Sequence, residues 1–256
     1  MNPMPATLSS CSISRPCSGF TLVEVTVALA VLGIIAAAAA AAYLGLFSAS
    51  RNKLNADASL ASLAGAVVAF AQSHHRLPCP DVDGSGNESL VAGVCPTNRD
   101  VGWFPYLSAG LTSPAPLARA IYGVYRSVGA DLARAEEHGG DPVGSASYAD
   151  GADLIHALRF ATVQVPSNAY IYLTGNNATS GAENCGGNVV SNPAFVVLVP
   201  GEDRNGNGSP VDGIHGTLPA SGHCFAAPTR ASDTYFDDRT LAVSFYTLMA
   251  KLNNEL

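Results

Sequence analysis

The chain has 256 residues, of which 48% are hydrophobic and 13% charged, and its formal net charge is −7. The length allows one large domain or two small ones, and the apolar content excludes a globally disordered chain. The acidic balance argues against a general nucleic-acid-binding surface, because such surfaces attract phosphate through clustered Lys and Arg.

The N-terminal region combines a polar leader with a long apolar segment. Residues 1–19 contain one charged side chain, Arg15, whereas residues 25–47 carry no charge. About 20 apolar helical residues span a bilayer, so a single membrane pass is predicted. Glu24 lies immediately before this segment, where a carboxylate is costly unless a function accounts for it. A secretory-type cut among the alanines at 38–40 is an alternative way to process such a segment.

The hexapeptide 19–24, Gly-Phe-Thr-Leu-Val-Glu, together with the apolar segment that follows, resembles the class III leader of type IV pilins and of type II secretion pseudopilins. The resemblance implies that a prepilin peptidase cuts after Gly19 and methylates Phe20. It also implies that Glu24 serves assembly by meeting the N-terminal amine of a neighbouring subunit. The competing interpretation places Glu24 at the headgroup level of an ordinary membrane anchor.

Helical periodicity continues beyond the apolar segment. Apolar residues recur at spacings of three, four and three, which predicts a stripe on one helix face formed by Leu60, Leu63, Val67 and Phe70. We expect one helix over residues 20–75, ended by the prolines at 78 and 80. Its outer part would pack this stripe against a globular domain.

Four of the six cysteines lie beyond the leader: Cys79, Cys95, Cys185 and Cys224. An even number in a segment predicted to lie outside the cytoplasm suggests two disulfides. Three pairings are open, and we favour the sequential one, which closes two loops rich in Gly, Asn and Pro. A zinc site is the weaker alternative, because the chain has no C-x-x-C pair.

Two loops place oxygen-bearing side chains at alternate positions beside glycines, as calcium-binding loops do. The candidate ligands are Asp81, Asp83, Ser85, Asn87 and Glu88 in the first loop and Asp203, Asn205, Asn207 and Asp212 in the second. Neither loop has the glutamate at position twelve of an EF-hand, and ordinary Asx and glycine turns have the same composition. Calcium is therefore a candidate cofactor, with metal-free turns as the alternative.

Strands are expected over residues 122–128, 158–165, 170–174, 194–199 and 240–243. The second and third would form a hairpin, 194–199 a central strand buried on both faces, and 240–243 an edge strand. Short helices are expected over 114–120, 131–138 and 245–252, with Ser244 capping the last. The aromatic stretch 102–107 is expected between helix and sheet, with an exposed adhesive patch as the alternative.

Catalytic motifs are missing from the sequence, which contains no G-x-S-x-G elbow, no G-x-x-x-x-G-K-[ST] phosphate loop and no H-E-x-x-H pair. His215 and His223 are expected to be structural or exposed rather than catalytic. We therefore predict a protein that is not an enzyme.

These observations predict an α+β, pilin-like fold: a long N-terminal helix, transmembrane in its first half, packed on a mostly antiparallel sheet with long loops and a short C-terminal helix. The expected parts are a leader (1–19), a transmembrane and filament-core helix (20–47), an outer amphipathic half (48–77) and an extracytoplasmic globular domain (78–256).

The predicted function is that of a structural subunit, a minor or specialised pilin, of a type IV pilus or a type II secretion pseudopilus. Its partners would be prepilin peptidase, other pilin or pseudopilin subunits and the bacterial inner membrane, with no nucleic acid. A pilus-tip adhesin would add a receptor to the same role. The alternative is a single-pass, membrane-anchored extracytoplasmic domain that binds a ligand or calcium, or acts as an enzyme, and does not polymerise.

Overall fold

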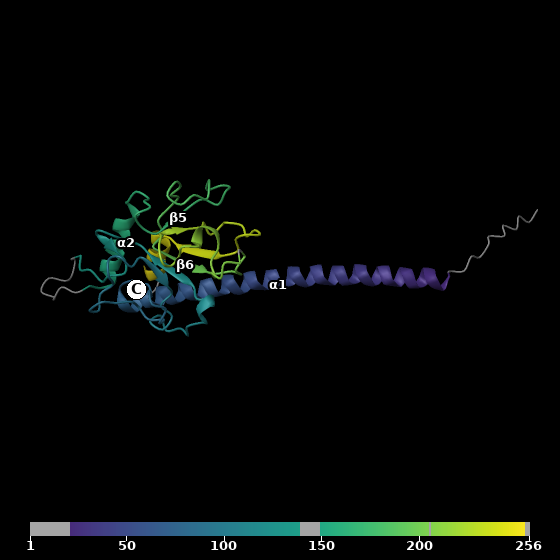
Figure 1. The fold of residues 1–256 in the computed structure, drawn as a ribbon. Helices are drawn as coiled ribbons and strands as arrows, with labels where there is room; N and C mark the ends of the chain where they lie inside the picture. Colours follow the sequence, from purple (N-terminus) through teal and green to yellow (C-terminus); the bar gives the residue numbers. More distant parts are fainter. Residues whose placement is uncertain (1–20, 139–148, 205, 254–256) are drawn as a thin grey trace, which may run out of the picture. The chain divides into compact units, whose positions relative to one another are not determined.

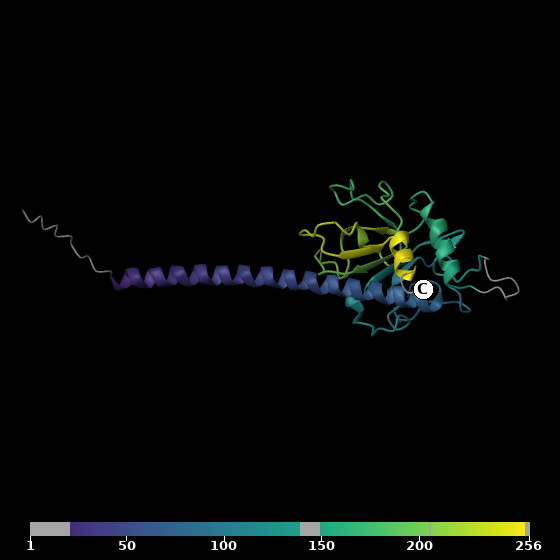
Figure 2. The ribbon, with the colours of Figure 1, turned by 180° about the vertical axis from the view of Figure 1, so that it is seen from behind.

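The structure, a computed structural model, describes residues 21–138, 149–204 and 206–253, and it describes no side chains at 44–50 and 52. The chain divides into two units, residues 1–52 and 53–256, and each is described by itself. Figure 1 and Figure 2 show the ribbon from opposite sides.

The helices are α1 (Leu22–His74), α2 (Gly151–Thr162) and α3 (Phe245–Asn253), with 3₁₀ turns η1 (Pro116–Ala118) and η2 (Gly213–His215). The strands are β1 (Val101–Trp103), β2 (Ile121–Val124), β3 (Arg126–Ser127), β4 (Ala130–Asp131), β5 (Tyr172–Leu173), β6 (Phe195–Val199), β7 (Cys224–Phe225) and β8 (Arg239–Val243).

Helix α1 confirms the predicted long helix and ends at His74. His75 adopts a positive φ of 54°, and its N–H donates to the carbonyl of Ala71, which closes the last turn. The apolar stripe is also confirmed, because Leu60, Leu63 and Val67 are buried in the core of unit 53–256.

The main sheet has the strand order β1-β2-β6-β8, with every pair antiparallel. β6 is an interior strand whose residues Phe195–Leu198 are fully buried, and β8 forms one edge, as the sequence predicts. Figure 1 shows β6 between α1 on one side and β5 on the other. The two faces of β6 are thereby covered by different elements.

The layer formed by β5 and β7 approaches the sheet closely at Gly123. A side-chain carbon at this glycine would lie 3.1 Å from Ile171 and 3.2 Å from Phe225. Gly123 therefore lets this layer pack directly on β2. On the core side, Phe104 and Tyr106 are buried, which confirms the expected placement of that part of the aromatic stretch, whereas Leu107 is half exposed.

Helix α2 corrects the prediction of a strand over 158–165. Asp150 caps this helix: its carboxylate accepts from the N–H groups of Ala152 and Asp153, and the Asp153 side chain accepts from the N–H of Asp150. Leu154, Leu158 and Ala161 then fall on the buried face at helical spacing. The capping signal and this 3.6-residue period outweigh the short alternation around Phe160 that suggested a strand.

The predicted hairpin of 158–165 with 170–174 is also wrong. β5 pairs in parallel with β7, Tyr172 opposite Cys224, so its partner lies far away in the sequence. Short-range turn signals carry no information about such a pairing.

The remaining differences are local. The predicted helix over 131–138 is replaced at its start by β4, which pairs with β3 across a turn that Gly129 makes possible with φ 78°. The strand predicted over 122–128 is split into β2 and β3, and the helix predicted over 114–120 is reduced to η1. The last helix is confirmed as α3, and the Ser244 hydroxyl accepts from the N–H of Thr247, as a cap does.

The buried stripe of α1 generates a stability prediction. Leu63 is 5% exposed and Leu54 is 68% exposed. The same substitution at both positions changes helix propensity equally, so a difference in stability between the two variants measures the effect of burial. We expect Leu63→Ala to lower the free energy of unfolding by about 2–5 kcal/mol, and Leu54→Ala by less than about 0.5 kcal/mol. Urea titration of the full chain in detergent, followed by Trp103 fluorescence, measures both. Equal losses would mean that the stripe does not anchor α1 to the core.

Candidate functional site

The first turn of α1 forms a capping box between Thr21 and Glu24. Glu24 Oε2 accepts from the backbone N–H and from the hydroxyl of Thr21, each at 2.9 Å, and Thr21 Oγ1 accepts from the N–H of Glu24 at 3.2 Å. Gly19 and Phe20 lie outside the described residues. The sequence pattern T-x-x-E is the signal for this cap. The sequence prediction treated Glu24 only as an ion-pair partner and did not include the cap.

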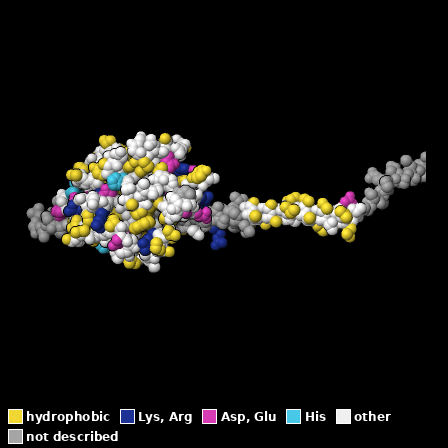
Figure 3. Space-filling view, viewed as in Figure 1, with side chains coloured by type: hydrophobic (Ala, Val, Ile, Leu, Met, Phe, Trp, Pro, Cys, Tyr) yellow, Lys and Arg dark blue, Asp and Glu magenta, His cyan; other side chains and the backbone are white. Residues whose placement is uncertain are grey.

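The first part of α1 exposes its apolar side chains on all sides. Every residue from 21 to 43 is exposed, including Leu22 at 82% and Ile34 at 71%. The space-filling view in Figure 3 shows hydrophobic side chains along this helix, with an acidic side chain near its start. Residues Leu22–Tyr43 are long and apolar enough to cross a membrane, with a mean hydropathy of 2.5.

A second segment, Lys53–His74, passes the same test of length and composition. This part of α1, however, buries Leu60, Leu63 and Val67 in the core of its own unit. A core helix of a globular domain has this pattern of one buried face. The two segments of α1 therefore differ in burial, although both are long and apolar enough to cross a membrane.

Both predicted disulfides are present in the sequential pairing. Cys79 Sγ and Cys95 Sγ are bonded, with the Cα atoms 5.6 Å apart, and Cys185 and Cys224 are bonded with a Cα separation of 5.7 Å. Arg126 adds a buried anchor to the first loop: its Nη2 donates to the carbonyl of Cys95 at 3.0 Å. These links hold loops that have few regular backbone hydrogen bonds.

The first candidate calcium loop uses its oxygens within the loop. Both carboxylate oxygens of Asp81 are engaged, because Oδ1 accepts from the N–H groups of Asp83 and Gly84 and Oδ2 accepts from that of Gly86. Burial raises the pKa of the Asp81 carboxyl, and the hydrogen bond from Gly86 acts against this shift. Asp81 thus organises the loop as an Asx turn.

Among the other candidate ligands of this loop, Asp83 forms a side-chain contact with Asp81, whereas Ser85 and Glu88 have their hydrogen bonds elsewhere. Asp83 Oδ1 accepts from the N–H of Ser85, and Ser85 Oγ accepts from the N–H of Asn87. Glu88 turns to Arg76, with an oxygen-to-nitrogen distance of 2.5 Å, and also accepts from the N–H of Cys79. The structure therefore uses Glu88 to anchor the end of α1.

The second candidate loop leaves one buried oxygen without a partner. Asp203 accepts from the N–H groups of Asn207 and Gly208, and Asp212 Oδ2 accepts from that of Arg204, whereas Asn205 lies outside the described residues. Asp212 Oδ1 is buried and has no hydrogen-bond partner. Among the described residues, no group of three His, Cys, Asp or Glu is placed to hold a metal ion. Calcium stays a prediction.

Two further polar clusters were not predicted. His215 Nδ1 lies 2.8 Å from Asp238 Oδ2, and its Nε2 accepts from the N–H of Ala226. The proton therefore lies on Nδ1, and with both nitrogens engaged and the ring fully buried, His215 offers no free base. These two hydrogen bonds connect η2 to the end of β7 and to the segment before β8, which is a structural role.

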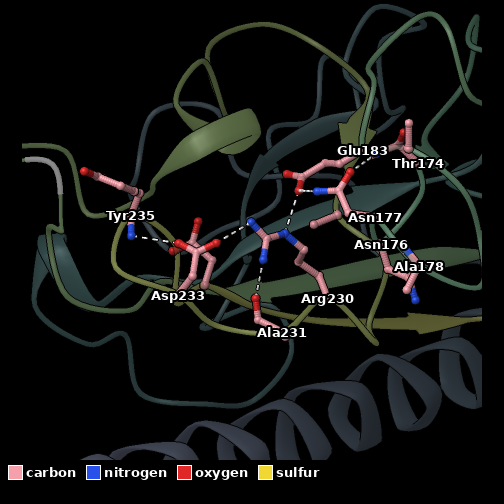
Figure 4. Close-up of polar contacts among 12 residues, drawn as sticks. Thr174, Asn176, Asn177, Ala178, Glu183, Arg230, Ala231, Asp233 and Tyr235 are labelled. Atoms are coloured by element: carbon pink, nitrogen blue, oxygen red, sulfur yellow. Dashed lines mark hydrogen bonds and ion pairs between the residues drawn. The ribbon is translucent and has the colours of Figure 1, made fainter.

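Figure 4 shows the second cluster, in which Arg230 lies between Glu183 and Asp233. Its Nε is 2.6 Å from Glu183 Oε2, its Nη2 is 2.7 Å from Asp233 Oδ2, and its guanidinium lies 4.7 Å from the ring centre of Phe236. The cluster joins two long loops, and each of these charges is met by an opposite one. No sequence pattern could have paired Arg230 with Glu183, because they lie 47 positions apart.

The calcium prediction has a direct test at the second loop. We expect calcium to raise the Tm of the chelator-treated protein, because a ligand that binds only the folded state stabilises that state. Asp212→Asn should reduce this rise, since it removes the charge of the carboxylate whose Oδ1 has no hydrogen-bond partner, whereas Asp233→Asn, outside both loops, serves as the matched control. A Tm that is the same in calcium and in chelator would identify both loops as metal-free turns.

Comparison with known proteins finds the prokaryotic N-terminal methylation motif at residues 14–40. No curated protein matches the chain, and neither does any solved structure. The motif covers the capping box and most of the exposed apolar part of α1. The chain therefore carries, at the start of an α+β pilin-like fold, the prepilin-type signature of type IV pilins and pseudopilins.

Proposed function

We propose that this chain is a structural subunit, a minor or specialised pilin, of a type IV pilus or a type II secretion pseudopilus. The observation that carries the proposal is the methylation motif at residues 14–40, which continues into an apolar helix that is exposed on every side. Before assembly, lipid would surround residues 22–43 in the bacterial inner membrane, and after assembly other subunits would.

The composition of this helix suits both environments. Residues 36–42 are all alanine, and small side chains let helices approach closely. Apolar side chains are shielded from water both in lipid and in a helix bundle. Close packing and polar contacts between helices therefore determine whether the subunits associate. Unit 53–256 would lie on the extracytoplasmic side, which agrees with its two disulfides, because such bonds persist in oxidising compartments.

Glu24 has a physical reason to be retained in this helix. Cleavage after Gly19 creates a charged amine on Phe20, and a carboxylate in an apolar bundle costs far less when a cation lies beside it. Both capping contacts of Glu24 end on Oε2. A carboxylate has about four lone-pair sites, so Glu24 can keep its cap and also accept from the amine of a neighbouring subunit.

The proposed processing predicts the chemical form of the N-terminus. Mass spectrometry of the protein from a host with prepilin peptidase should identify N-methylated Phe20 as the first residue. Gly19→Leu should block the cut, because it replaces the residue after which the resemblance places the cleavage, and the full leader should remain. A mature N-terminus at Met1 or among the alanines at 38–40 would contradict the proposal.

The capping box allows the two roles of Glu24 to be separated. Gln can replace Glu in such a cap, so Glu24→Gln keeps the helix start and removes the charge, whereas Thr21→Ala weakens the cap and keeps the charge. We expect Glu24→Gln to insert normally but to be lost from sheared filaments by at least about tenfold, which corresponds to about 1.4 kcal/mol. Thr21→Ala should assemble nearly as the unmodified protein does.

The measurement is the ratio of sheared to membrane-bound protein by immunoblot. If Glu24→Gln assembled normally and Thr21→Ala did not, Glu24 would serve only the helix cap. If both variants inserted into the membrane normally and no strain yielded sheared protein, a membrane-anchored domain that does not polymerise would be favoured.

A further inference from the structure

The Cys185–Cys224 disulfide lies in the wall of an open pocket in unit 53–256. The pocket has a volume of about 540 Å³, and its wall includes Tyr172, Ile214, Thr217 and His223 together with both cysteines. Apolar and hydrogen-bonding side chains therefore surround a sulfur–sulfur bond. This volume is sufficient for a small molecule.

The two disulfides differ in exposure. Cys79 and Cys95 are 0% and 2% exposed, so a dissolved thiol cannot reach that bond in the folded protein. Cys185, in contrast, is an exposed residue, and its partner Cys224 is only 7% exposed. Thiol–disulfide exchange needs access to one sulfur along the bond, and only the second disulfide offers it.

The wall of the pocket also contains an imidazole. His223 precedes Cys224 and lines the same pocket, and its Nε2 lies 3.6 Å from Asp100 Oδ2. Asp100 is itself held near Arg126, with Nη1 at 4.0 Å from Oδ1. Burial raises the pKa of the Asp100 carboxyl, while His223 and Arg126 act in the opposite direction. A protonated imidazole at this place favours a nearby thiolate.

We propose that Cys185–Cys224 is an exchange site for small thiols that dock in this pocket, with Cys185 as the residue that is modified. The thiolate of the incoming molecule attacks Cys185 Sγ, the bond to Cys224 Sγ breaks, and its electron pair leaves on Cys224 as a thiolate. The product is a mixed disulfide on Cys185. The reaction consumes no further oxidant or reductant, and attack by Cys224 on the adduct reverses it.

The residues around Cys185 have contacts that do not depend on the disulfide. Thr174 Oγ1 donates to the carbonyl of Asn184 and accepts from its N–H, and Tyr172 Oη accepts from the N–H of Gly186. The Glu183–Arg230 ion pair, drawn in Figure 4, holds the same loop from its other side. The residues that flank Cys185 thus keep their own partners. The inference does not depend on the proposed assembly role.

The test treats the full chain in detergent with reduced glutathione, quenches with iodoacetamide and maps the cysteines by mass spectrometry. We expect the glutathione adduct on Cys185, and alkylation of Cys224, at least about tenfold faster than any modification of Cys79 or Cys95. Equal rates at the two disulfides, or faster opening of Cys79–Cys95, would overturn the proposal. The intact Cys79–Cys95 bond also reports that each variant remains folded.

Two variants test the pocket and the imidazole. Thr217→Phe fills part of the pocket, so it should slow glutathione several-fold while leaving 2-mercaptoethanol nearly unchanged. His223→Gln removes the imidazole next to Cys224 and its contact with Asp100, so it should slow the exchange at Cys185. If Thr217→Phe slowed neither thiol, docking in the pocket would be refuted. An exchange rate that His223→Gln leaves unchanged would refute the role of His223.

Discussion

Burial of one face of α1 is the interaction on which the globular unit depends. Leu60, Leu63 and Val67 place a single apolar stripe in the core that the sheet closes from the other side. Because β6 is an interior strand and buries Phe195–Leu198, it needs cover on both faces, and α1 supplies one of them. The same helix, in residues 22–43, has no such face and is apolar and exposed all round.

The long loops are held by a few strong contacts rather than by regular structure. Two disulfides close them, Arg126 anchors the first, and Arg230 and His215 join segments that lie far apart in the chain. The guanidinium groups of Arg126 and Arg230 and both ring nitrogens of His215 meet partners, because a buried polar group without one is costly. The buried contact of His215 with Asp238 is one of these links between distant segments.

The helix start has a local contact and, in the proposed assembly, would also have an intermolecular one. The capping box of Thr21 and Glu24 stabilises the first turn of α1 with groups from the same chain. An ion pair to a neighbouring amine would use the remaining capacity of the same carboxylate. In the proposed assembly, this double use would make a residue that is costly in a membrane compatible with a stable subunit before assembly and a specific contact after it.

The sequence by itself determined the features that depend on local patterns. The hexapeptide at 19–24, the apolar segment and the stripe at Leu60–Val67 predicted the motif and the course of α1, and the cysteine count with loop composition favoured the disulfide pairing that the structure has. Only the tertiary structure decided what depends on distant partners. Three such contacts are the pairing of β5 with β7, the ion pair of Arg230 with Glu183 and that of Glu88 with Arg76. The local sequence around each residue does not predict its partner, because packing and long-range hydrogen bonds select these neighbours.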